Sequence, residues 1–128
     1  MPLVRINHPA GKSKDFLTAV SQGVYRAMLD TFDVPRDDLF QVLSESGHGT
    51  RMVRPEQYLG IRYSDDLTFI QITCNDSRTV EQKKAFYAAV ADNLSRDAGL
   101  RREDILISLV EVKKENWSFG NGLAQYAM

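Results

Sequence analysis

The second residue of the chain is a proline, and it opens a run with the alternation of a strand, Pro2-Leu3-Val4-Arg5-Ile6-Asn7. An initiator methionine is usually removed before so small a residue, and loss of Met1 would leave a secondary amine at the chain start. The ordinary pKa of an α-amino group is roughly 7.7–8.0, so this amine can give or take a proton near neutral pH. An internal proline nitrogen is an amide and cannot. Pro2 is therefore a candidate acid–base group, although many chains begin Met-Pro with no catalytic role.

Size and charge narrow the class of protein. A chain of 128 residues with 43% hydrophobic residues is expected to form one domain, residues 1–128. The formal net charge of -1, without a dense Lys/Arg block, argues against nucleic acid or a membrane surface as the main partner. Cys74 is the single cysteine, so no intrachain disulfide can form. The N-terminus lacks a basic n-region and an apolar h-region, so we expect no signal peptide. We expect a cytoplasmic protein that does not span a membrane.

The chain resembles itself at an offset of 66 residues. Residues 36–45 align with 102–111, and three identities result: Arg36 with Arg102, Asp38 with Asp104 and Glu45 with Glu111 (102 minus 36, 104 minus 38, 111 minus 45). The same offset aligns 2–7 with 68–73, and both runs alternate apolar and polar residues as strands do. We interpret the chain as a pseudo-repeat of residues 2–45 and 68–111, with a connecting loop 46–67 and a C-terminal segment 112–128.

Each half contains one helical pattern between its two strands. Apolar residues recur at i, i+3 and i+4 spacing at Phe16, Val20, Val24, Ala27, Met28 and Phe32, and again at Ala85, Phe86, Ala89, Val90 and Leu94. Ser13 is a candidate N-cap of the first helix, and Thr79 with Gln82 is typical of a capping box for the second. Val34-Pro35 and Ala98-Gly99 end the two helices.

These elements predict an α+β fold built from two fused β-α-β units. A helical crossover makes the two strands of each half parallel, which gives a four-stranded mixed sheet with both helices on one face. The other sheet face has nothing from this chain to cover it, so we expect a homotrimer.

Several motifs, spread over nearly the whole chain, resemble the tautomerase superfamily, and most closely malonate semialdehyde decarboxylase and its relatives. The Glu81-Gln82-Lys83 and Trp117-Ser118-Phe119-Gly120 clusters are the most specific parts of this resemblance. The other parts are Pro2-Leu3, Tyr25-Arg26-Ala27-Met28, Phe32, Val34-Pro35, Asp38, Gln41, Ser44-Glu45, Phe86-Tyr87 and Leu109-Val110-Glu111.

The resemblance implies a set of site residues. Pro2 matches the catalytic amine, Asp38 the aspartate that hydrogen-bonds to it, and Arg78 an arginine that binds the substrate carboxylate. Trp117 and Phe119 match apolar walls of the pocket. A second family arginine is replaced by Asp76.

Each of these residues also has an ordinary interpretation. Asp38, like Asp104, fits a turn before a strand. Arg78 fits a solvated residue before a helix, and Trp117 and Phe119 fit a core or an interface. Arg51 or Arg54, in the loop, is a candidate for the missing cation.

Two other motifs fail. Gly11-Lys12-Ser13 is like the end of a phosphate-binding loop, but Ile6 stands where that loop needs glycine. His8 and His48 lack metal-ligand spacing with each other or with Cys74. We expect no metal and no cofactor.

Three functions remain open. The first is decarboxylation of a 3-oxo acid, with a protonated Pro2 amine polarising the carbonyl. The second is keto–enol tautomerisation of an enol-pyruvate substrate, with a neutral Pro2 as the base. The third is a non-catalytic trimeric binding protein of the same fold, which follows if Met1 is retained. The first two make the partner a small oxo acid.

Overall fold

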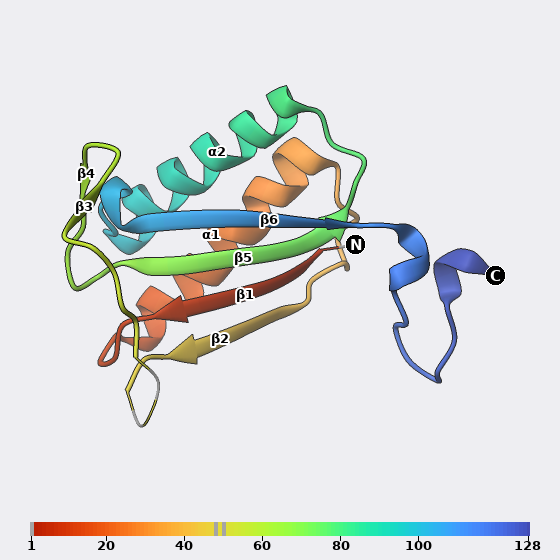
Figure 1. The fold of residues 1–128 in the computed structure, drawn as a ribbon, viewed down its shortest axis with the longest axis horizontal. Helices are drawn as coiled ribbons and strands as arrows, with labels where there is room; N and C mark the ends of the chain where they lie inside the picture. Colours follow the sequence, from red (N-terminus) through yellow and green to blue (C-terminus); the bar gives the residue numbers. More distant parts are fainter. Residues whose placement is uncertain (1, 48, 50) are drawn as a thin grey trace.

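A computed structural model describes residues 2–47, 49 and 51–128. The expectations about Met1 and His48 lie outside the described residues. The main elements in chain order are β1 (Leu3–His8), α1 (Lys14–Phe32), β2 (Gln41–Glu45), β3 (Gln57–Tyr58), β4 (Ile61–Arg62), β5 (Thr68–Asn75), α2 (Val80–Ala98) and β6 (Ile105–Val112) (Figure 1). Three short 3-10 helices complete the list: η1 (Arg102–Asp104), η2 (Lys114–Asn116) and η3 (Gln125–Ala127).

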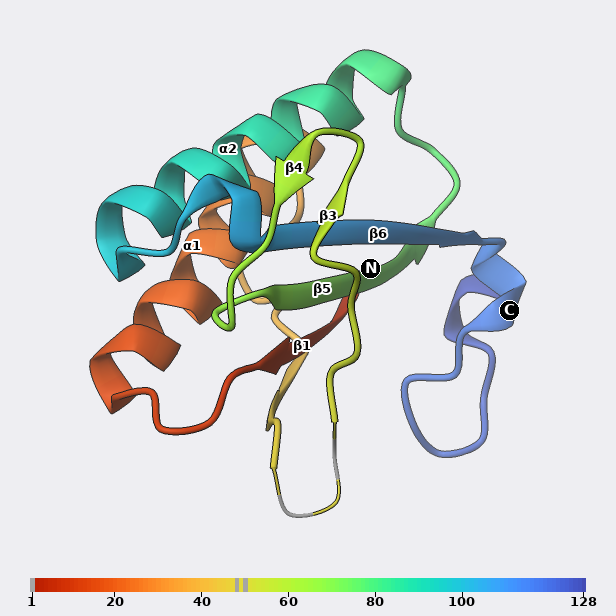
Figure 2. The same cartoon turned by 60° about the vertical axis from the view of Figure 1, so that its left-hand side comes forward.

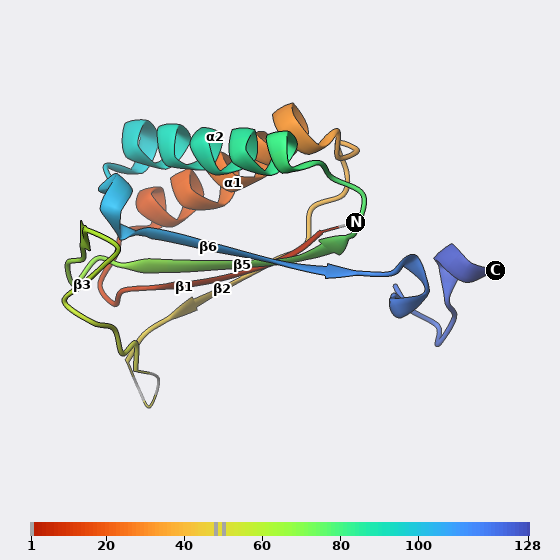
Figure 3. The same ribbon diagram turned by 45° about the horizontal axis from the view of Figure 1, so that its top comes forward.

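Four strands form one mixed sheet in the order β2-β1-β5-β6. The pairs β1–β2 and β5–β6 are parallel, while β1 and β5 are antiparallel. Both long helices cover one face of this sheet, and the other face is open (Figure 3). The predicted α+β fold of two β-α-β units is therefore confirmed.

The strand registers are related by a pseudo-twofold axis. Val4 pairs with Gln41 and Ile70 with Ile107, so the parallel partner lies 37 positions further along in both pairs (41 minus 4, 107 minus 70). In the antiparallel ladder Leu3 pairs with Thr73 and Asn7 with Phe69, and the 66-residue offset exchanges these two pairs. Because β1 and β5 run in opposite directions, the start of β1 and the start of β5 lie at opposite ends of the sheet.

The helix boundaries follow the predicted caps. The Ser13 hydroxyl accepts a hydrogen bond from the Phe16 N–H at 3.1 Å, and Thr79 forms the full capping box with Gln82. Asp33 ends α1 with a φ of 52°, and Gly99 ends α2 with a φ of 66°. The left-handed conformation suits glycine at Gly99 because it has no Cβ.

The core lies between the helices and the covered sheet face. Phe86 is fully buried there, and its ring stacks on Phe32 with a centroid distance of 4.6 Å. Gly23 allows the helices to approach closely, since a Cβ at this position would lie 2.6 Å from Leu94 Cδ1. Such dense packing resists displacement, so the sheet ends are rigid supports for the side chains that project from them.

The open sheet face mixes apolar and polar side chains. Val42, Leu106 and Val110 are 41%, 37% and 40% exposed, and Arg5 and Gln71 lie among them. Exposed apolar residues on β2 and β6 make this face a candidate for burial against other copies of the chain.

The segment predicted as a loop, residues 46–67, contains the β3–β4 hairpin. Leu59 and Gly60 form its two-residue turn with φ values of 51° and 79°. Two-residue strands are too short to show a period in sequence, so the prediction missed them. Figure 2 shows the hairpin beside the start of β6, where Arg101 Nη2 donates to the Arg62 carbonyl at 3.3 Å. Among the described residues, no helix is long and apolar enough to cross a bilayer.

Candidate active site

Pro2 is buried at the start of β1, between the chain segments that enter β2 and leave β5. The Val4 N–H donates to the Phe40 carbonyl at 3.0 Å, which holds the approach to β2 against the chain start. Leu3 pairs with Thr73, so Pro2 lies one position further, beside Cys74. The residue that begins the chain's first strand is thus fixed on both sides by neighbouring strands.

Asp38 and Arg78 reach the same end of the sheet from different halves of the chain. Asp38 lies in the turn before β2, and its N–H donates to the Pro35 carbonyl at 3.0 Å. Arg78 lies between β5 and α2. The antiparallel pairing of β1 with β5 places the end of β5 next to the start of β1, and therefore places Arg78 near Pro2.

The electrostatics of Asp38 agree with this arrangement. Burial raises the pKa of the Asp38 carboxyl above its ordinary value, while the positive charge of Arg78 acts in the opposite direction. Charge interactions weaken with distance, so Arg78 lies near this carboxyl group. Asp38 and Arg78 therefore form a charged pair at the end of the sheet where Pro2 lies.

The Arg78 side chain is half-buried and held in place by Phe32. Its Nη2 donates to the Phe32 carbonyl at 3.3 Å, and its Cζ lies 4.9 Å from the centre of the Phe32 ring. A guanidinium has five N–H donors in a planar fork, so most of them remain for other partners. A fork fixed in this way suits bidentate binding of a carboxylate.

Trp117 and Phe119 lie beyond the end of β6 and face this cluster. Their rings stack with a centroid distance of 5.5 Å, and Trp117 Nε1 donates to Asn75 Oδ1 at 2.8 Å. They line a cavity of ≈ 230 Å³ with Leu3, Ser118 and Phe40.

A second cavity, of ≈ 310 Å³, adjoins the first and includes the predicted aspartate. It is lined by Asp37, Asp38, Phe40, Phe119 and Tyr126. Phe40 and Phe119 belong to both cavities, so the aromatic wall and Asp38 share one depression of the surface. Tyr126 packs edge-on against Phe119 at 4.9 Å. The sequence analysis did not select it, because a lone tyrosine near the chain end carries no motif.

Lys83 and Glu111 also lie near this end and had no predicted role. Lys83 Nζ is 2.7 Å from Glu111 Oε1, and Glu111 pairs in register with Cys74. Burial is the main cause that raises the pKa of the Cys74 thiol. The charge of Glu111 also raises this pKa, while the charges of Arg78 and Lys83 lower it. Cys74 and Glu111 meet through the register of β5 and β6, and Lys83 reaches them from α2. These contacts depend on packing between separate elements, so no local sequence pattern could have identified them.

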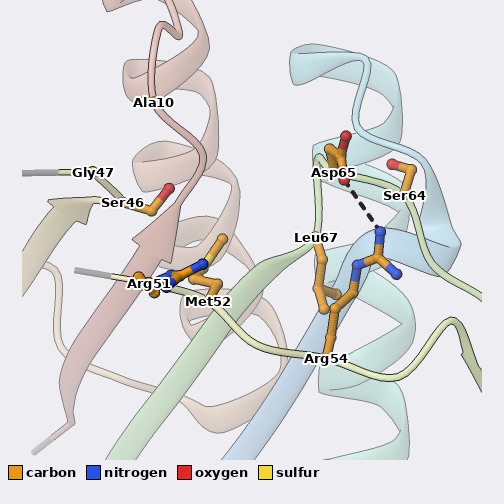
Figure 4. A pocket seen from close by; sticks show the side chains of 9 residues that line it. All are labelled: Ala10, Ser46, Gly47, Arg51, Met52, Arg54, Ser64, Asp65 and Leu67. Atoms are coloured by element: carbon orange, nitrogen blue, oxygen red, sulfur yellow. Dashed lines mark hydrogen bonds and ion pairs between the residues drawn. The ribbon is translucent and has the colours of Figure 1, made fainter. Parts of the chain in front are cut away.

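Asp76, which replaces the second arginine of the related family, is exposed. Asp76 lies just beyond β5, and its N–H donates to the Val112 carbonyl at 3.2 Å. Arg51 and Arg54 line a cavity with Ala10 and Leu67, which follow β1 and precede β5 (Figure 4). Six residues of strand, about 20 Å, separate this end from Pro2. The hypothesis that either arginine supplies the missing cation is therefore wrong within one subunit. Across the described ranges, no group of three or more His, Cys, Asp or Glu side chains could hold a metal ion.

Known proteins resemble this chain over nearly its whole length. The family model described as tautomerase enzyme matches residues 38–120. Probable tautomerase YusQ of Bacillus subtilis (strain 168) is 38% identical over 98% of each chain. Probable tautomerase YrdN of the same organism is 30% identical, over 98% of this chain and 96% of its own.

Solved structures also resemble this chain over nearly its whole length. A malonate semialdehyde decarboxylase, described with decarboxylase and hydratase activities, superposes with a TM-score of 0.88 and 30% identity over 98% of this chain and 95% of that one. A second such decarboxylase, inhibited by 3-bromopropiolate, has a TM-score of 0.88 and 28% identity over 98% and 94%. A wild-type fused 4-OT described as a symmetric trimer shares the fold, with a TM-score of 0.77 and 22% identity over 98% of each chain.

Proposed function

Since the chain belongs to the tautomerase family, we propose that it is a cofactor-independent enzyme that uses the Pro2 amine for acid–base chemistry on small oxo acids. The observation that carries this proposal is the meeting of Pro2, Asp38 and Arg78 at one end of the sheet. The role of Pro2 requires a mature chain without Met1, because only then is its nitrogen an amine.

The favoured reaction is decarboxylation of a 3-oxo acid. Arg78 holds the substrate carboxylate, and the protonated Pro2 amine donates a hydrogen bond to the 3-oxo oxygen. The bond between C2 and the carboxyl carbon breaks, CO₂ leaves, and the electron pair moves through C2 to the polarised oxygen as an enol or enolate. Protonation of C2 then completes the product, and the Pro2 amine is the proton donor.

Two features of the site support this mode. The Asp38 carboxylate stabilises the charged form of a neighbouring amine and so keeps Pro2 protonated. Trp117 and Phe119 provide an apolar wall beside it, and removal of water strengthens the hydrogen bond to the developing charge. The similarity to two malonate semialdehyde decarboxylases agrees with this choice.

Keto–enol tautomerisation of an enol-pyruvate substrate is the second candidate. A nearby guanidinium such as that of Arg78 and the burial of Pro2 would both favour a neutral amine, which would act as a base between oxygen and carbon. Two relatives described as probable tautomerases support this alternative.

We also propose a homotrimer in which the open sheet faces meet. Val42, Leu106 and Val110 are the apolar residues that such contacts would bury. The fold is shared with a protein described as a symmetric trimer. A cytoplasmic location completes the proposal, because the single cysteine fits a reducing compartment.

The test is an NMR titration of the Pro2 amine, combined with turnover of one 3-oxo acid and one enol pyruvate. A pKa well above neutrality with decarboxylation as the main activity supports the first candidate. A pKa well below neutrality with tautomerisation supports the second. If protein confirmed to start at Pro2 processes neither substrate, the fold serves as a non-catalytic binding protein, and the proposed enzyme is wrong.

A further inference from the structure

The pseudo-twofold axis pairs the proposed active site with a second location at the opposite end of the sheet. The 66-residue offset relates Arg78 to Lys12, Asp38 to Asp104 and Trp117 to Arg51 (78 minus 12, 104 minus 38, 117 minus 51). The strand registers obey the same offset, so the strand ends that these residues adjoin correspond in space as well as in sequence. The start of β5 is thus the structural counterpart of the start of β1.

Cavities occur at both locations and have corresponding walls. The cavity beside Pro2 is lined by Leu3, Phe40 and Phe119. Their counterparts are Phe69, Leu106 and Val53, and these three residues also line a single cavity, of ≈ 320 Å³.

A cavity of ≈ 340 Å³ adjoins this counterpart, and the two share Arg54 and Leu67 (Figure 4). Ala10 and Arg51 line it, at the positions that correspond to Asp76 and Trp117. The second location therefore repeats the depression found at the first.

The chemistry of the second location differs in one decisive way. The chain runs through Leu67 into Thr68, so no amine can exist where the first location has Pro2. Asp104 is fully buried, and its carboxylate accepts from the Ser64 N–H at 2.8 Å, from Ser64 Oγ at 2.5 Å and from Arg101 Nη1 at 3.3 Å. Because its carboxylate is occupied by these donors, Asp104 cannot serve an incoming ligand as an acid or a base.

The second location has two arginines in its cavity, Arg51 and Arg54. Arg51, whose sequence position corresponds to Trp117, lines the cavity, and no ion pair of Arg51 occurs within the part of the chain that the structure describes. The Arg54 side chain is only 24% exposed, and its Nη2 lies 3.2 Å from Asp65 Oδ1. Asp65 is fully exposed, so an incoming anion can replace it at little cost. Lys12 Nζ lies 2.7 Å from Asp66 Oδ1 and is already paired. Among the basic residues of this region, Arg51 and Arg54 line the cavity and are the cations that an anion can reach there.

We propose that this cavity is a second, non-catalytic binding site for a small carboxylate anion, held by Arg51 and Arg54. Guanidinium forks bind carboxylates in a bidentate manner, and the Ser46 hydroxyl lines the same cavity. Binding here needs no amine at Pro2, so it is independent of the proposed catalysis.

The test is an amide-shift titration of the ¹⁵N-labelled protein with malonate, and with inorganic phosphate as the comparison. We expect saturable shifts at Ser46, Ser64 and Leu67. Arg51→Gln and Arg54→Gln should each weaken binding by about 10-fold. Arg62→Gln is the matched control, because Arg62 pairs with Glu56 at 2.8 Å outside the cavity and should leave the affinity unchanged.

Arg78→Ala separates the two locations, since it should reduce the shifts around Leu3 and leave those at Ser46 intact. Unchanged affinity in both arginine variants would overturn the proposal, and so would shifts confined to the Leu3 end. Tighter binding of phosphate than of malonate would overturn the assignment to a carboxylate. Loss of catalytic activity in any variant bears only on the proposed function.

Discussion

Asp38 and Asp104 occupy equivalent positions in the two halves, and we predict that they have opposite effects when each is changed to asparagine. Asp104→Asn replaces a fully buried carboxylate that accepts three hydrogen bonds. The amide retains one acceptor oxygen and directs an NH₂ group toward the donors Ser64 or Arg101. Hydrogen bonds to charged groups contribute about 1.5–3 kcal/mol each, and relief of the buried charge offsets part of the loss. We expect a net loss of about 3 kcal/mol in the free energy of unfolding, or roughly 10 °C in Tm.

Asp38→Asn should leave the stability unchanged or slightly raised at pH 7. Burial raises the pKa of Asp38 in the folded protein, so deprotonation costs stability as the pH rises through and above its ordinary value. An uncharged amide removes this cost. Turnover should fall by roughly 10²-fold, because the amine of Pro2 loses its carboxylate partner.

Urea unfolding and kcat, measured at pH 7 on both variants, check this pair of predictions. The pH dependence of kcat should change in Asp38→Asn and stay as in the wild type in Asp104→Asn. A wild-type unfolding midpoint in Asp104→Asn would refute the hydrogen-bond argument. Wild-type turnover and pH profile in Asp38→Asn would remove Asp38 from the site.

The remaining predictions concern the amine, the assembly and the substrate. The active protein should begin at Pro2, and blocking its amine should abolish activity; intact mass showing Met1 in fully active protein contradicts this. Sedimentation should give a trimer, and a monomer at micromolar concentration would exclude the proposed sheet contacts. Arg78→Ala should raise KM by roughly 10–100-fold with a smaller change in kcat, since it removes a contact to the carboxylate of the bound substrate. With Asp76 in place of a second cation, monocarboxylates should be better substrates than dicarboxylates; equal kcat/KM for the two classes would show that Asp76 is irrelevant.

Local signals in the sequence predicted the secondary structure well. Ser13, Thr79 and Gly99 mark helix ends through hydrogen bonds and backbone conformations that involve only nearby residues. The apolar periods of both helices identified the buried faces, because a helix exposes a fixed set of positions to its core. The β3–β4 hairpin was missed, since two residues cannot show a period.

The two aspartates show where this reasoning reaches its limit. Their alignment in the repeat favoured a shared role in a turn, and both do precede a strand. Asp104 is nevertheless fully buried against Ser64, while Asp38 lies half-buried near Arg78, in the turn that enters β2 beside the start of β1. The difference arises because the chain segment that precedes β5 donates hydrogen bonds to Asp104 through Ser64, whereas Asp38 lies near the start of β1, which has no such preceding strand connection among the described residues.

The sequence by itself determined the repeat, the helices and the candidate amine, because each is a property of residues close together in the chain. The tertiary structure alone decided which groups meet. Arg78 lies at the same end of the sheet as Pro2 because β1 and β5 pair in antiparallel orientation, and Arg51 and Arg54 lie at the opposite end, where β1 ends and β5 begins. Strand order and direction depend on packing between segments far apart in sequence, and no local period or cap records that packing.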